Sequence, residues 1–174
     1  MPALAAALAL VALPALAQTI PAPKTSVSAG EKATATYFTE DSYGDVQLGE
    51  LGVQRAHDPA VRALARAMVR DHTRTAEAGM RVARAIGDDD VQAKAGDDNQ
   101  IELSHLARYQ GAQFDREYAT AMVDAHKTDI ATAKDALEFV QSPELRTYLR
   151  DSIAVDSRHL AMAEAARARV GGGD

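Results

Sequence analysis

Three histidines and one aspartate lie at matching depths in four segments that have the apolar spacing of long helices. His72, His126 and His159 follow the predicted starts of their helices by thirteen to sixteen residues, and Asp45 follows the start of its own helix by fourteen. Residues near the middle of packed helices meet at one level, whichever way each helix runs, so we expect these four side chains to converge. Imidazole and carboxylate groups are ligands for transition metals such as zinc, copper and iron.

His72 and His126 are also predicted to face the core. His72 is four residues after Met68, and His126 is four residues after Met122. Residues four apart lie on one face of a helix. Methionine beside histidine would suit copper in an oxidising compartment. Methionine is also a common filler of apolar cores, however, and we assign Met68 and Met122 to the core.

His159 shares its predicted inward face with Asp156, which lies three residues before it. Both residues continue a stripe formed by Leu145, Leu149 and Ser152. The resulting Asp-x-x-His pair is close to the Glu-x-x-His unit that supplies metal ligands in four-helix bundles. A carboxylate at this spacing can instead orient the imidazole through a hydrogen bond.

The predicted metal site therefore consists of His72, His126, His159, Asp45 and Asp156, and the candidate metals are zinc, copper and iron. Burying several polar groups is costly unless they pair with one another or coordinate an ion. The alternative is a metal-free network of histidine–aspartate hydrogen bonds in a structural or stress-related interaction module. A di-iron oxidase ranks below both, because such bundles use about four carboxylates and two histidines.

Several other functions are disfavoured by what the sequence lacks. It has no Gly-x-Ser-x-Gly, phosphate-binding glycine loop or His-Glu-x-x-His motif, so it favours a binding role over an enzymatic one. A net charge of −6 without a basic run argues against a nucleic-acid partner, and no feature indicates a particular protein partner. The absence of cysteine excludes disulfides and thiolate metal sites.

Composition indicates an all-α protein. The 174 residues are rich in alanine and leucine, with no tryptophan and three phenylalanines. Alanine and leucine favour helices, whereas strands favour β-branched and aromatic residues. Three glycines in the first predicted helix, Gly44, Gly49 and Gly52, weaken it locally but would let a neighbouring helix approach closely.

Helix-start signals divide the chain into its predicted elements. Ser28 with Glu31 forms a capping-box pattern, and Asp58 and Ser142 each precede a proline. A long polar connection, with a short helix of its own, separates the second and third long helices. This order predicts a ferritin-like four-helix bundle with a crossover. The four long helices are predicted at about 31–56, 58–86, 112–140 and 142–170, and the short helix at about 99–109.

The N-terminal segment predicts export. Residues 1–17, MPALAAALALVALPALA, are apolar throughout and end in a small-x-small pattern, which is typical of a signal peptide cleaved before Gln18. Residues 18–30 form a predicted flexible lead-in, and residues 31–170 the predicted bundle domain. No second long apolar run follows, so we expect a periplasmic mature protein without an integral membrane segment.

With these residues identified, the chain resembles the bacterial family called domain of unknown function 4142. The most specific similarity lies in residues 67–72, in residues 111–118 leading to His126, and in His159-Leu160. The resemblance extends from about Ala33 to Ala166. The family usually has glutamate where this chain has Asp45. Because the family is assigned to the ferritin-like superfamily and to export, the resemblance implies both features here, and it implies no particular reaction.

Overall fold

The computed structural model describes residues 27–172, which form five α-helices and no strand. The predicted all-helical class is thus confirmed for this part of the chain. The predicted signal peptide and most of the lead-in lie outside the described residues. The helices are α1 (Ala29–Arg55), α2 (Pro59–Ala85), α3 (Asp97–Leu106), α4 (Gly111–Phe139) and α5 (Pro143–Gly171).

Three of the long helices begin at the side-chain caps that the sequence predicts. The Ser28 hydroxyl accepts a hydrogen bond from the Glu31 backbone at 3.1 Å, and the Glu31 carboxylate accepts one from the Ser28 backbone at 3.0 Å. Asp58 caps α2 and Ser142 caps α5, each before a proline in the first turn. These contacts satisfy backbone N–H groups that have no partner within the helix.

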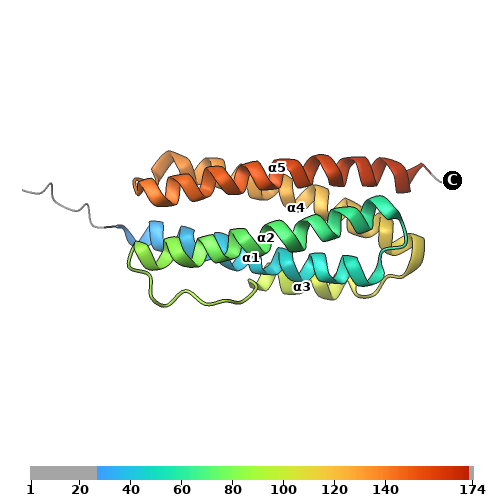
Figure 1. The fold of residues 1–174 in the computed structure, drawn as a ribbon, viewed down its shortest axis with the longest axis horizontal. Coiled ribbons are helices and arrows are strands. Elements are labelled where there is room, and N and C mark those ends of the chain that lie inside the picture. The colour runs from blue at the N-terminus through green and yellow to red at the C-terminus, as the bar shows by residue number, and fades with distance from the viewer. Residues whose placement is uncertain (1–26, 173–174) are drawn as a thin grey trace, which may run out of the picture.

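The long helices form two antiparallel hairpins, α1–α2 and α4–α5, which pack together chiefly through α2 and α5 (Figure 1). The connection between the hairpins runs back along the bundle, and its helix α3 contacts α1 and α4. As a result, α2 and α4 run in the same direction (Figure 1). The four long helices therefore all have their middle turns in the centre of the bundle.

Each hairpin supplies a carboxylate that binds the turn of the other hairpin. Glu31, at the start of α1, accepts hydrogen bonds of 2.8 Å from both backbone N–H groups of residues 141–142. Asp115, near the start of α4, accepts hydrogen bonds of 3.0 and 2.8 Å from the backbone N–H groups of residues 57 and 58. These two turn contacts lie at opposite ends of the bundle (Figure 1). The hairpins are thus joined at both ends by hydrogen bonds to otherwise unpaired backbone groups.

Two apolar clusters form the core. One contains Leu48, Leu64 and Phe114, and the other contains Phe38 and Leu149. The polar residues of the predicted site lie between the two clusters along the helices. Burial of apolar surface on both sides therefore fixes the helices around this polar middle.

Close approach of α1 and α2 depends on glycine, as the sequence indicates. A β-carbon at Gly49 would lie 3.0 Å from the backbone oxygen of Ala65 and 3.0 Å from the backbone nitrogen of Val69. At Gly52 it would lie 2.7 Å from the side chains of Ala65 and Tyr118. The absence of a side chain lets the two helix backbones pack directly against each other.

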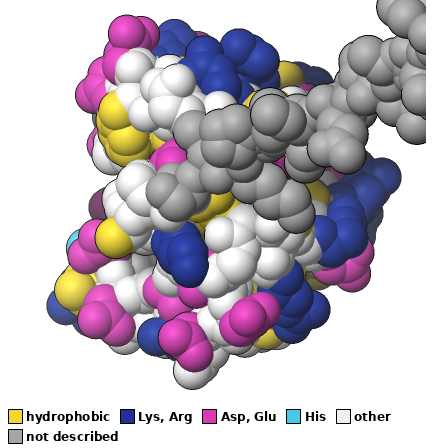
Figure 2. Space-filling view, turned by 90° about the vertical axis from the view of Figure 1, so that its left-hand side faces the viewer, with side chains coloured by type: hydrophobic (Ala, Val, Ile, Leu, Met, Phe, Trp, Pro, Cys, Tyr) yellow, Lys and Arg dark blue, Asp and Glu magenta, His cyan; other side chains and the backbone are white. Residues whose placement is uncertain are grey.

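One end of the bundle has a charged surface of mixed sign (Figure 2). At the end of the bundle where α1 begins, basic and acidic side chains are interspersed (Figure 2). None of the helices between residues 27 and 172 combines the length and the apolar character that spanning a membrane requires.

Candidate metal centre

The five predicted ligands lie in one buried cluster, to which each long helix contributes. Asp45 comes from α1, His72 from α2, His126 from α4, and Asp156 and His159 from α5. The three histidines are between 0 and 2 % exposed. Their ring centroids are separated by 4.9, 5.5 and 5.6 Å. The geometry thus brings all five residues together, while their role as metal ligands stays a prediction.

The three histidines bring one ring nitrogen each within 4.8 Å of the others. Nε2 of His72 lies 3.0 Å from Nδ1 of His159 and 3.3 Å from Oδ2 of Asp45. Donors bound to one ion at roughly 2.1 Å in tetrahedral geometry lie roughly 3.4 Å apart. Each of these two pairs therefore has a spacing suited to a shared ion. Oδ1 of Asp156 lies farther away, at 4.0 Å from Nε2 of His72.

Asp71 orients His159 from outside the cluster. Its Oδ2 lies 3.2 Å from Nε2 of His159. Burial alone would raise the pKa of Asp71, but hydrogen bonds from Arg70, Arg74 and His159 outweigh burial and hold this pKa below its usual value. The ionised carboxylate can only accept, so Nε2 of His159 donates and Nδ1 keeps its lone pair facing His72.

His126 is fully buried, and neither of its ring nitrogens has a hydrogen-bond partner among the described residues. Nδ1 of His72 and Oδ2 of Asp45 also lack hydrogen-bond partners. A neutral imidazole always carries one N–H donor and one acceptor, and leaving either unpaired in the core costs about 1–3 kcal/mol. A bound ion would coordinate one nitrogen of His126 and Oδ2 of Asp45, and these two unpartnered groups are the strongest structural indication of a ligand.

Burial keeps the histidines in the neutral form that binds metals. Burial lowers the pKa of His126 to about 4. It also lowers the pKa of His159 to about 4, although the nearby Asp71 opposes this shift. The pKa of His72 is well below its usual value because of burial and because His126 and His159 are close. At neutral pH all three imidazoles are therefore available to an ion without losing a proton.

The carboxyl groups are shifted in the opposite direction. Burial raises the pKa of Asp45 well above its usual value, and the neighbouring Asp41, Asp129 and Asp156 add to this effect. Burial, with Asp129 and Asp41, raises the pKa of Asp156 to about 8. A cation in the cluster would favour the ionised form of these groups and so reverse the shifts.

Sequence reasoning missed three aspartates around the cluster. Asp129 lies with its Oδ2 3.7 Å from Nδ1 of His126, and Asp71 and Asp41 lie close by. Asp129 could have been found, because it follows His126 by three residues, the same separation that draws attention to Asp156. Asp71 directly precedes His72 in the sequence, a position that helical periodicity alone assigns to a different face.

The predicted core role of the two methionines agrees with the structure. Met68 and Met122 are completely buried in an apolar cluster. The hydroxyl of Tyr118 donates a hydrogen bond of 3.3 Å to the sulfur of Met68. Both side chains therefore fill the core beside the polar cluster.

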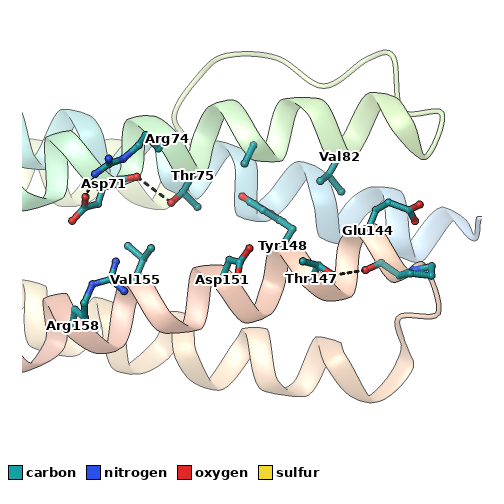
Figure 3. Close-up of a pocket in the computed structure, with 12 residues that line it drawn as sticks. Asp71, Arg74, Thr75, Val82, Glu144, Thr147, Tyr148, Asp151, Val155 and Arg158 are labelled. Atoms are coloured by element: carbon teal, nitrogen blue, oxygen red, sulfur yellow. Dashed lines mark hydrogen bonds and ion pairs between the residues drawn. The ribbon is translucent and has the colours of Figure 1, made fainter.

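A groove of about 760 Å³ approaches the cluster between α2 and α5. Asp71 and Arg74 of α2 face Arg158 and Val155 of α5 across it (Figure 3). Asp71 therefore separates His159 from the solvent in this groove.

The model of the family described as "Domain of unknown function (DUF4142)" matches residues 16–166. The chain belongs to this family. No curated protein sequence matches the DUF4142 chain. Its fold is similar to that of CopM in the Cu(I)-bound form, with a TM-score of 0.68 at 22% identity over 82% of this chain and 98% of that chain.

Two further CopM structures give the same result. The Cu(II)-bound form has a TM-score of 0.67 at 20% identity, and the apo form 0.67 at 22% identity. Each covers 80% of the DUF4142 chain and 96% of the CopM chain. At this level of identity the likeness establishes a shared fold.

Proposed function

We propose that this DUF4142 protein is an exported, ferritin-like bundle that binds and buffers copper at its buried histidine–aspartate cluster. The ligands are His72, His126 and His159, with Asp45 and Asp156 beside them. The observation that carries the proposal is that one ring nitrogen each of His72, His126 and His159 lies within 4.8 Å of the others, while His126 has no hydrogen-bond partner among the described residues.

Copper is favoured over zinc and iron by two considerations. Imidazole-rich sites suit copper and zinc. Iron in four-helix bundles is instead bound mainly by carboxylates. CopM, whose fold is similar, has solved structures in Cu(I)-, Cu(II)- and silver-bound forms. Deep burial of all three histidines also favours holding an ion over converting a substrate, because a substrate needs an accessible metal.

The topology and the N-terminal sequence support the other parts of the proposal. A single crossover between two helical hairpins is the arrangement of ferritin-like bundles, and the α2–α4 connection runs as such a crossover would (Figure 1). Residues 1–17 have the apolar run and small-residue ending of a signal peptide. Copper binding by imidazole and carboxylate needs no reduced thiol, which suits an oxidising compartment.

A metal-free polar network is the second candidate. Two hydrogen bonds of His159 favour it: Nε2 donates to Asp71 and Nδ1 accepts from Nε2 of His72, so both nitrogens of His159 are already satisfied. This network leaves His126 without a partner, however, and metal binding accounts better for this residue.

The decisive experiment measures copper content and melting temperature of the purified protein with Cu²⁺, with Zn²⁺ and with a chelator. We expect one copper per chain and a higher melting temperature, since a ligand of the native state at 100 times its Kd stabilises by about 2.7 kcal/mol. His126→Ala should abolish the copper-dependent shift while circular dichroism stays helical. His57→Ala is the matched control, because His57 is exposed and lies outside the cluster.

Identical melting of the wild type with and without copper or zinc would contradict the proposal and leave the polar network in its place. Loss of the shift in His57→Ala would show that copper binds at the surface.

A further inference from the structure

Beside the three histidines, a second set of ligand groups lies between α1 and α4. We propose that Asp41, Asp45 and Asp129, with His126, form a separate subsite for an oxygen-preferring divalent cation such as Mn²⁺. It adjoins the copper site and shares Asp45 and His126 with it. For these two shared residues the inference rests on the proposed function. Carboxylate oxygens with one imidazole are the donors that Mn²⁺ prefers to thiolates or to imidazoles alone.

The geometry of this set is that of a loose, preformed ligand group. One donor atom each from Asp45, His126 and Asp129 lies within 4.8 Å of the others. Asp41 lies one helical turn before Asp45 on α1 and lines the same pocket as Asp45 and Asp129. The subsite thus draws its donors from two helices that face each other.

No basic side chain compensates these carboxyl groups. Within residues 27–172, the ion pairs of Asp45 and Asp129 are with histidines of the cluster, and none involves Lys or Arg. Asp45 is 2 % exposed and Oδ2 of its carboxyl accepts no hydrogen bond, while Asp129 is 6 % exposed. Ionised carboxyl groups in one buried place repel each other, and either protonation or a bound cation relieves this repulsion.

A pocket connects the set to the solvent. It has a volume of about 460 Å³ and lies between α1, α3 and α4. Its lining has exposed carboxylates such as Asp98 and Asp124 near the surface and the buried Asp45 and Asp129 at its base, with no Lys or Arg. A cleft lined by one sign of charge concentrates counter-ions, so this pocket attracts cations toward the subsite.

Helix α3 completes this acidic pocket through Asn99. The Asn99 side chain occupies the space beside Gly44 where a β-carbon would collide with it, and its Nδ2 lies 3.5 Å from Oδ1 of Asp41. This contact holds α3 against α1 and places Asp98 and Glu102 over the opening. The crossover helix therefore contributes to the route by which a cation reaches Asp41.

The test titrates Mn²⁺ into the purified protein and measures free Mn²⁺ by electron paramagnetic resonance. We expect the wild type to bind one Mn²⁺ per chain. Asp129→Asn and Asp41→Asn should each weaken binding by about tenfold or more, the order of loss that follows from removing groups at a metal site. His159→Ala, which removes a ligand of the copper site only, should bind Mn²⁺ like the wild type.

Asp135→Asn is the matched control, because Asp135 is exposed on α4 and does not line the pocket. Circular dichroism verifies the fold of each variant, and His72→Gln replaces His159→Ala if the latter loses helix. The inference is overturned if the wild type binds no Mn²⁺, or if the Asp129 and Asp41 variants bind it unchanged. It is also overturned if His159→Ala loses Mn²⁺ as Asp129→Asn does, since a single centre would then bind both metals. Failure of copper binding alone would leave the Mn²⁺ titration intact.

Discussion

Burial shifts the protonation of Asp156 and of the histidines in opposite directions. Asp156 has a pKa of about 8 in the folded protein against an ordinary value of 3.8, so the folded state binds its proton more tightly than the unfolded state. The resulting contribution of Asp156 to stability is fully present below pH 3.8 and is lost as the pH rises through about 8. His126, with a pKa of about 4 against 6.5, has the reverse effect, and its contribution is lost as the pH falls from 6.5 toward 4.

Between pH 6.5 and 8 the histidine contribution is constant and the carboxyl contribution dominates. We therefore expect the melting temperature of the metal-free protein to fall over this range, with up to about 1.4 kcal/mol lost per pH unit for each proton released. Asp156→Asn should lessen the fall, because an amide does not titrate. Melting curves at several pH values in the presence of a chelator measure both effects.

Asp151→Asn is the control for this prediction, since Asp151 is exposed on the same helix. A melting temperature that rises from pH 6.5 to 8, or an equal slope in the wild type and Asp156→Asn, would contradict it.

At the level of single residues, helical periodicity predicts the inward direction of the histidines correctly. It does not predict all of the residues that surround them. His72 and His126 follow apolar residues at intervals of four, so their inward direction is a local property of the helix. The hydrogen bond from His159 to Asp71 joins α5 to α2, and its formation depends on how the two hairpins pack. No local pattern in the sequence encodes that distance.

At the level of helices, Gly49 governs the α1–α2 interface. The β-carbon of Gly49→Ala would meet backbone atoms of Ala65 and Val69, which cannot rotate away. Alanine gains about 1 kcal/mol in helix propensity over glycine, but overpacking costs about 1–3 kcal/mol. We expect a net loss of stability, which chemical denaturation of the variant measures.

Gly30→Ala is the matched control in the same helix. A β-carbon there would meet only Ser28 at 3.8 Å, an ordinary contact, so this variant should be as stable as the wild type or more stable. Equal stabilisation by both substitutions would show that α1 and α2 are packed less closely than the structure indicates.

The helix limits follow closely from the sequence because caps are local. Ser28, Asp58 and Ser142 hydrogen-bond to residues two or three positions ahead, and α1, α2 and α5 begin within two residues of the predicted starts. The contacts of Glu31 with residues 141–142 and of Asp115 with residues 57–58 span more than fifty positions. They depend on the packing of the hairpins, so only the structure reveals them.

For the whole molecule, the apolar segment 1–17 leads to a prediction about its fate in the cell. Cleavage after Ala17 should leave Gln18 as the first residue of the exported protein, and its amine can cyclise onto the glutamine side chain. Mass spectrometry of protein from the periplasmic fraction measures this mass. Exported protein that still contains Met1 would contradict the prediction.

The two turn contacts of Glu31 and Asp115 also fix the axial register of the hairpins. Sliding one hairpin along the other by a single helical turn, about 5.4 Å, would break both sets of hydrogen bonds at once. Because the contacts lie at opposite ends, they oppose slippage in either direction. The depth at which His72 of one hairpin meets His126 and His159 of the other is therefore determined at the ends of the bundle, far from the histidines themselves.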